Sequence, residues 1–209
     1  MILPADFYHR PTLDVARDLI GKVLVRDARS TRTAGVIVEV EAYIGEDDPA
    51  CHAAPGPTAR NAPLYGPPGV AYVYLNYGLH ALFNAVTEPE GAPAAVLIRA
   101  LEPVEGLSLM RRRRSRAPWR RGKPLVPDHE LCRGPGNLTC ALGITLADNR
   151  RRLTAPPLSI EDRGLTAGEI EWSSRIGISV GTEHAWRCSA RGHASLSGPR
   201  TRRGPSPGC

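Results

Sequence analysis

The sequence contains very little lysine, few aromatic residues and no long apolar run. Lys22 and Lys123 are the only lysines, so arginine supplies nearly all of the 27 basic residues. Aromatic residues make up 5% of the 209 positions. No apolar stretch reaches the length of a signal-peptide core or a membrane-spanning helix. We therefore expect a cytoplasmic protein that is neither secreted nor bound to a membrane.

Paired cysteine motifs are also missing. The five cysteines are odd in number and include no CxxC pair, which argues against a zinc ribbon or a disulfide framework. His52 follows Cys51 and lies close to two aspartates, a grouping that could suggest a metal, but no second ligand pair accompanies it. We expect no metal and no cofactor.

The positive charge is concentrated in two segments. Net charge is +6, yet residues 111–123 alone hold eight basic residues and no acid, and residues 184–209 hold five more arginines without an acid. The remainder of the chain is mildly acidic. Localised arginine favours an anionic partner, most commonly nucleic acid, although a solvated loop in an arginine-rich chain would have the same composition.

The hydrophobic pattern predicts one α+β domain over residues 1–188. Strands are expected at residues 22–26, 35–43, 70–77, 81–86, 94–100, 158–161 and 176–180. Helices are expected after Pro11 with Thr12 as the cap, over 103–114, and after the glycine-rich turn in 130–144. Residues 189–209 contain almost no large apolar side chain, so we expect a basic, disordered tail.

The strongest strand signal is GVIVEVEAY at residues 35–43. A period of two places Glu39, Glu41 and Tyr43 on one face, together with Ile37, and three valines on the other. Two carboxylates are costly to bury unless they line a polar site. An ordinary solvent-exposed face would explain the same pattern.

The second prominent strand, VAYVYLNY at residues 70–77, carries three tyrosines. Tyr72 and Tyr74 share a face with Asn76, and such tyrosines either pack across strands or provide a stacking surface for a base. Tyr77 precedes a flexible glycine at the strand end, where its ring could protrude as a wedge.

Four blocks occur in the chain in this order: VEVEAYIGEDDPACHA, YGPPGVAYVYLNYGLHALFN, AVLIRALEPVEG and LCRGPGNLTCALGI. Together they resemble the 3-methyladenine (methylpurine) DNA glycosylase family over roughly residues 4–187. The resemblance implies a curved, mostly antiparallel sheet flanked by helices and long loops. It also implies a monomer that hydrolyses the N-glycosidic bond of 3-methyladenine, 7-methylguanine and hypoxanthine in double-stranded DNA, after flipping the nucleotide out of the helix.

The same resemblance implies roles for individual residues. Glu41 would be the general base, and Arg99 would help to hold the attacking water. The pocket for the flipped base would be lined by Tyr43, His52, Tyr74 and Asn84, with Asn84 obstructing the exocyclic amino group of guanine. Tyr77 would fill the gap left in the helix. Contacts to the DNA backbone are expected from Arg111, Arg112, Arg113, Gly134 and Gly136.

The chemistry fits these implied roles. An alkylated purine such as 3-methyladenine is cationic, so it leaves readily and is attracted to tyrosine rings. An activated water held near the sugar is then the main requirement. A glycosylase with lyase activity attacks through an amine, and neither lysine lies in the motif strands. We therefore expect a monofunctional enzyme without lyase activity.

Two other function classes remain open from the sequence. A non-catalytic nucleic-acid-binding module could share the fold. A carbohydrate glycosidase could use Glu39 and Glu41, whose positions on one strand face are about 7 Å apart. Two departures from the family pattern are also present. Asn137 stands where many relatives have lysine, and a polar segment follows Arg187 where a final apolar strand is usual, so we expect that strand to be weakened or lost.

Overall fold

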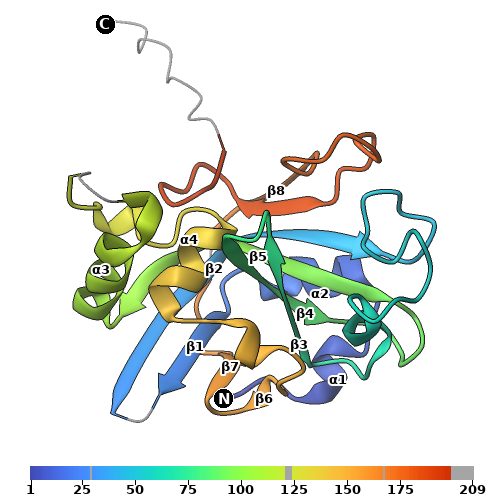
Figure 1. Ribbon diagram of the computed structural model, residues 1–209, viewed down its shortest axis with the longest axis horizontal. Coiled ribbons are helices and arrows are strands. Elements are labelled where there is room, and N and C mark those ends of the chain that lie inside the picture. Colours follow the sequence, from blue (N-terminus) through green and yellow to red (C-terminus); the bar gives the residue numbers. More distant parts are fainter. Residues whose placement is uncertain (29, 121–123, 167, 199–209) are drawn as a thin grey trace, which may run out of the picture.

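The computed structural model describes residues 1–28, 30–120, 124–166 and 168–198, and the strands within these ranges form one curled sheet (Figure 1). Its order is β3-β4-β5-β2-β1-β7-β6, with β9 paired to both β2 and β8, and every pairing is antiparallel. The strands are β1 (Val23–Ala28), β2 (Thr31–Ile44), β3 (Ala71–Asn76), β4 (His80–Val86), β5 (Ala94–Glu105), β6 (Thr154–Ala155), β7 (Leu158–Glu161), β8 (Ile170–Ser173) and β9 (Arg187–Ala190).

Short helices flank this sheet, which confirms the expected α+β class. The α-helices are α1 (Ala5–Tyr8), α2 (Thr12–Leu19), α3 (Leu107–Arg116) and α4 (Pro135–Leu142). Single 3-10 turns are η1 (Ala62–Tyr65), η2 (Pro118–Arg120), η3 (Asp128–Glu130) and η4 (Leu146–Asp148). In the described ranges no helix has both the length and the apolar character needed to cross a membrane.

Helix α2 follows Pro11 as predicted, but its N-terminus is held differently. Thr12 is the first helical residue rather than the cap, and its backbone N–H and hydroxyl both donate to Glu88 Oε1, at 2.7 and 2.8 Å. Val15, Ala16 and Leu19 are buried on one helical face within the main core. The β4–β5 turn therefore anchors this helix against the sheet.

Strand β2 is the longest strand and lies at a fork in the sheet. One edge of β2 pairs with β5, while the other pairs first with β1 and then, at residues 39–41, with β9. The register against β5 shifts at this point and leaves Val38 and Arg99 without opposite residues. As a result Ile37 and Val40 both enter the main core. The strict alternation predicted for residues 35–43 is therefore wrong on the N-terminal side of this irregularity.

Three sequence-based boundaries are corrected by the structure. Residues 103–105 extend β5 rather than begin a helix, because Gly106 adopts a left-handed conformation (φ 74°) and α3 starts only after it. Residues 176–180 form an irregular loop instead of a strand. The expected loss of the final strand is also wrong, since β9 pairs with β2 and β8, and Cys188 and Ser189 are fully buried there.

The predicted disordered tail from residue 189 is likewise wrong over residues 189–198. Ser195 is buried, Leu196 packs against the Val38 and Ala100 cluster, and Arg133 donates to the Leu196 and Gly198 carbonyls at 2.6 and 2.9 Å. Small residues and backbone polar groups supply most of the contacts of this segment, and Leu196 is its one large apolar side chain. The rest of the predicted tail, 199–209, lies outside the described residues.

Candidate active site

A cavity of about 380 Å³ opens against β3, β4 and β5, opposite the loop that contains Ile176. Among the residues lining it are six that sequence analysis singled out: Tyr43, His52, Tyr74, Tyr77, Asn84 and Arg99. Residues from four strands and two loops thus meet in one place. A volume of this size is within the usual range for small-ligand pockets, about 300–1,000 Å³.

Glu41 lies behind the wall of the cavity and is fully buried. Its Oε1 accepts the backbone N–H of Ile176 at 2.6 Å, and its Oε2 accepts Arg99 Nη1 at 3.0 Å and the Tyr43 hydroxyl at 2.9 Å. All three donor residues line the cavity. A carboxylate offers about four acceptor positions, so one position on Oε1 remains for a further donor such as water.

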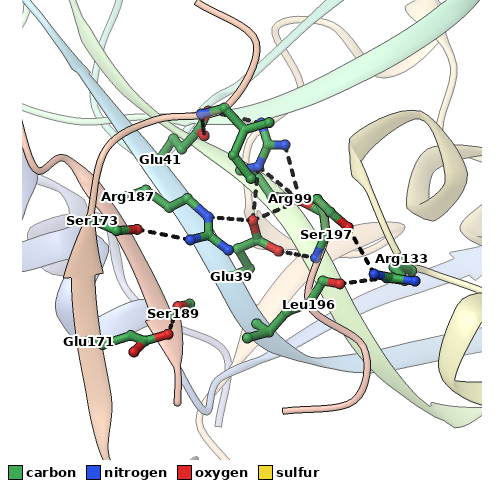
Figure 2. A network of polar contacts seen from close by, with 12 residues as sticks. Glu39, Glu41, Arg99, Arg133, Glu171, Ser173, Arg187, Ser189, Leu196 and Ser197 are labelled. Atoms are coloured by element: carbon green, nitrogen blue, oxygen red, sulfur yellow. Dashed lines mark hydrogen bonds and ion pairs between the residues drawn. The ribbon is translucent and has the colours of Figure 1, made fainter. Parts of the chain in front are cut away.

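Arg99 is held between the two carboxylates of β2. It lies where the β2–β5 register shifts, and its side chain is 8% exposed. Nη1 contacts Glu41, while Nε lies 3.1 Å from Glu39 Oε1 (Figure 2). Irregularities of this kind re-aim a side chain next to a functional site.

Glu39 is also fully buried, which rules out the solvent-exposed explanation for the two acids. Its oxygens accept four donors: Arg99 Nε, Arg187 Nε, and the hydroxyl and backbone N–H of Ser197. Burial acts to raise its pKa, but Arg99, the Ser197 N–H and Arg187 outweigh this and lower it. Of its three partner residues only Arg99 lines the cavity, whereas Arg187 and Ser197 do not, so Glu39 is held away from the cavity by these contacts. This argues against a carbohydrate glycosidase that uses both acids.

The aromatic wall of the cavity is formed by β2, β3 and the loop after β2. The rings of His52 and Tyr74 are 4.4 Å apart at an interplanar angle of 65°, and Tyr72 lies 5.2 Å from Tyr74. Tyr72 was expected to share a face with Tyr74. Its hydroxyl also forms a 2.9 Å hydrogen bond with Nδ1 of His52. Burial raises the pKa of Tyr43 and Tyr74, so both phenols stay neutral.

His52 is neutral near pH 7. Burial, assisted by the positive charge of Arg60, lowers its pKa below the usual value. A neutral imidazole beside neutral tyrosines makes this wall compatible with a cationic ligand. Among the described residues, no group of His, Cys, Asp and Glu has the arrangement needed to hold a metal ion.

Asn84 and Tyr77 occupy opposite ends of the β3–β4 hairpin. Asn84 is 4% exposed, and its Nδ2 donates to the carbonyl of Tyr72, the residue opposite it in the ladder, at 3.0 Å. That bond fixes the orientation of the amide. Tyr77 lies at the hairpin turn, where it is 88% exposed and has a left-handed backbone (φ 50°).

Sequence reasoning missed the loop that closes the site opposite the tyrosines. Arg175 and Asp48 form a fully buried ion pair with contacts of 2.6 and 2.8 Å. The guanidinium also lies 4.7 Å from the Tyr43 ring centre. Ile176, the next residue, supplies the N–H to Glu41. An isolated arginine 127 positions from its partner has no local sequence signal.

The predicted DNA-backbone residues lie in two places, the arginines on α3 and the two glycines at the start of α4. Arg111 pairs with Asp128, and Arg113 donates to the Ala141 carbonyl at 2.9 Å, while Arg112 is exposed on α3. Gly136 lies in the first turn of α4 against His80, where a Cβ would approach the imidazole within 2.9 Å. Gly134 precedes α4 with a φ of 97°.

Asn137 stands where the family pattern has lysine, and its side chain makes hydrogen bonds within the protein. Its amide nitrogen donates to the Arg133 carbonyl at 2.7 Å, and its amide oxygen accepts a close hydrogen bond from Arg114 Nη1. The side chain therefore links α4 to α3. Pro135 of the same helix lines the cavity.

The comparisons with known proteins point to one family. The family model for methylpurine-DNA glycosylase (MPG) matches residues 6–194. A relative from Methanocella arvoryzae, named "Putative 3-methyladenine DNA glycosylase", is 50% identical over 89% of this chain and 89% of its own. Relatives with the same name from Rhodopseudomonas palustris and Salinibacter ruber are 47% and 49% identical over 94% and 88% of this chain, and 91% of each of theirs.

Proposed function

This chain belongs to the methylpurine-DNA glycosylase family, and from this premise we propose that it hydrolyses the N-glycosidic bond of alkylated purines in double-stranded DNA. The proposed substrates are 3-methyladenine and 7-methylguanine, with hypoxanthine as a neutral, slower substrate. The main support is one observation: a buried carboxylate, Glu41, with one acceptor position left, beside a cavity lined by neutral aromatic side chains. Membership of this family argues against the alternative function of a non-catalytic nucleic-acid-binding module.

The damaged base would occupy the aromatic cavity after leaving the helix. Tyr43 and Tyr74 present neutral rings, and His52 is also uncharged near pH 7. A cationic methylated purine is attracted to such rings. Of the two arginines near them, Arg175 is 4.7 Å from the Tyr43 ring centre and is paired with Asp48, and Arg60 is 5.9 Å from the Tyr74 ring centre. The fixed amide of Asn84 would restrict the space available to the amino group of guanine.

The attacking water would bind the open acceptor position on Glu41 Oε1. Glu41 would take its proton as the water attacks the anomeric carbon, and the carboxylate would stabilise positive charge that develops on the sugar. Arg99 holds the other oxygen of Glu41, so the base has one orientation toward the cavity. A cationic purine leaves with its bonding electrons and needs no protonation.

The nucleotide would reach the cavity by flipping, with Tyr77 taking its place in the helix. Unpairing and unstacking cost a few kcal/mol. An exposed aromatic ring on a tight hairpin turn beside the cavity can offset part of that cost by stacking in the gap.

We also propose that the enzyme has no lyase activity. The residues lining the cavity include no lysine. The Lys22 amine pairs with Asp162 at 2.7 Å, and the terminal amine donates to the Asp162 carbonyl at 2.7 Å. Lys123 lies outside the described residues. Trapping of a covalent protein–DNA adduct by borohydride would contradict this proposal.

The decisive test uses duplex DNA that carries a single methylated purine or hypoxanthine. After incubation with the protein, alkali cleaves the DNA at abasic sites. The wild type should yield strand breaks only after alkali, and Glu41→Gln should yield almost none. The matched control is Glu90→Gln, an exposed carboxylate on the β4–β5 turn, which should behave like the wild type. Equal activity in Glu41→Gln and wild type would refute Glu41 as the base.

A further inference from the structure

Glu39 lies at the centre of a buried polar network behind the cavity (Figure 2). Arg99 reaches it from β5 and Arg187 from β9, while Ser197 approaches from the segment that follows β9. Ser197 contributes twice, with its backbone N–H 2.5 Å from Oε2 and its hydroxyl 2.7 Å from Oε1. Glu39 is absent from the cavity lining, so any effect on the reaction must pass through another side chain.

Arg99 is that side chain, and it is held along two edges. Its Nε contacts Glu39 at 3.1 Å, and its Nε and Nη2 both contact the Ser197 hydroxyl, at 3.2 and 3.0 Å. Only Nη1 contacts Glu41. An arginine facing a lone carboxylate prefers a two-pronged contact through parallel N–H bonds. Here Glu39 and Ser197 hold the Nε and Nη2 edge of the guanidinium, which fixes its orientation so that Nη1 alone meets Glu41.

Resting on the proposed function, we infer that Glu39 and Ser197 are positioning residues that keep Arg99 on one oxygen of Glu41. The second oxygen then keeps its open acceptor position for the attacking water. Glu39 also balances charge, because its carboxylate shares the positive charge of Arg99 with Glu41. The buried group of Glu39, Glu41, Arg99 and Arg187 has two charges of each sign.

The segment that carries Ser197 is itself firmly held. Arg133, just before α4, donates to the carbonyls on either side of Ser197, those of Leu196 and Gly198. On the opposite side of Glu39, Arg187 is fixed by the Ser173 hydroxyl at 2.8 Å. Residues 195–198, which have no catalytic signature in the sequence, thus complete the support of the catalytic pair.

The test compares Glu39→Gln with a matched control, Glu171→Gln. Glu171 lies on the adjacent strand β8 and contacts Ser189 and Arg191, but not Arg99. In Glu39→Gln, Arg99 is expected to close onto both oxygens of Glu41, and kcat should fall about 10- to 100-fold with KM for DNA unchanged. Because kcat is measured per folded molecule, a fall at unchanged KM reports on the reacting groups and not on the amount of folded protein.

Two further variants separate positioning from folding. Glu39→Asp keeps the charge and should recover part of the kcat that Glu39→Gln loses. Ser197→Ala, which keeps the backbone N–H, should also lower kcat, but less than Glu39→Gln does. Its control, Ser189→Ala, should leave kcat unchanged. If Glu39→Gln does not fold, the kcat of Ser197→Ala per folded molecule tests the inference instead.

If Glu39→Gln has a kcat per folded molecule equal to wild type and only a lower melting temperature, the inference is overturned. That result, combined with an inactive Glu41→Gln, would leave the proposed function intact. An active Glu41→Gln would instead remove the premise on which the positioning role rests.

Discussion

At the scale of single residues, the Asp48–Arg175 pair has the least solvent contact of any ion pair described in the molecule. Neither side chain is exposed, and Arg175 also donates to the Ala42 carbonyl. Breaking such a pair leaves a buried charge without compensation, which costs far more than an exposed pair contributes. The pair also fixes the loop that supplies the Ile176 N–H to Glu41.

We predict that Asp48→Asn lowers the free energy of unfolding by about 3 kcal/mol. Urea denaturation measures this, and Asp47→Asn is the control because Asp47 is exposed. Burial acts to raise the pKa of Asp48, but Arg175 and two backbone N–H groups lower it overall. Its contribution is therefore present above about pH 4, the unfolded value, and is lost as pH falls. A variant–wild-type difference that stays constant down to pH 2 would contradict this.

Tyr43→Phe tests the hydroxyl that donates to Glu41. The hydroxyl is one of three donors that hold Glu41 in place, so its removal should lower kcat. The ring remains in the cavity wall, so the affinity for damaged DNA should change little. A kcat equal to that of the wild type would show that the hydroxyl does not act on Glu41.

At the scale of elements, the β3–β4 hairpin combines backbone strain with exposure. Tyr77 adopts a left-handed conformation that costs a tyrosine of order 1 kcal/mol or more, yet its ring is 88% exposed and contributes little packing. A glycine would suit the backbone better. The presence of a large aromatic residue at such a position points to a use outside folding.

We predict that Tyr77→Gly keeps the free energy of unfolding within about 1 kcal/mol of wild type, since relief of strain offsets the added chain entropy. Excision from duplex DNA should fall sharply, while excision from single-stranded DNA, which needs no wedge, should not. Tyr77→Phe, which keeps the ring, serves as the control. Equal losses on both substrates would argue against a wedge.

At the scale of the whole molecule, much of the basic charge is already paired. Arg26, Arg99, Arg163, Arg175 and Arg187 all form ion pairs within the domain. The net charge therefore overstates the number of basic side chains that are available to contact DNA. On α3, Arg111 pairs with Asp128, whereas Arg112 is exposed and has no ion-pair partner among the described residues.

Arg112→Ala should weaken binding to duplex DNA regardless of the base present, and should reduce the slope of log K against log salt by about 1. Arg17→Ala is the control, because Arg17 is exposed on α2 and pairs with Asp14 and Asp18. Titrations at several salt concentrations measure both slopes. An unchanged slope for Arg112→Ala would remove α3 from the DNA contact.

The sequence alone determined the α+β class and most strands, and it supplied the residues of the proposed site, because these depend on local patterns. Alternating valines predict a strand whatever surrounds it, and the motif blocks carry the resemblance that implies Glu41, Arg99 and the tyrosines. A two-residue repeat, however, cannot reveal where a sheet forks. The register shift beside Val38 therefore escaped prediction, as did the entry of Ile37 and Val40 into one core.

Only the tertiary structure decided how the two acids of β2 are held. Both lie on one face of the predicted strand, yet Glu39 accepts four donors, three of them on Oε1, while Glu41 accepts three from residues that line the cavity. The donors that make this difference, Ile176 and Ser197, lie 135 and 158 positions from their acceptors. Hydrogen bonds over such separations form only when the sheet curls and brings the C-terminal segments against β2.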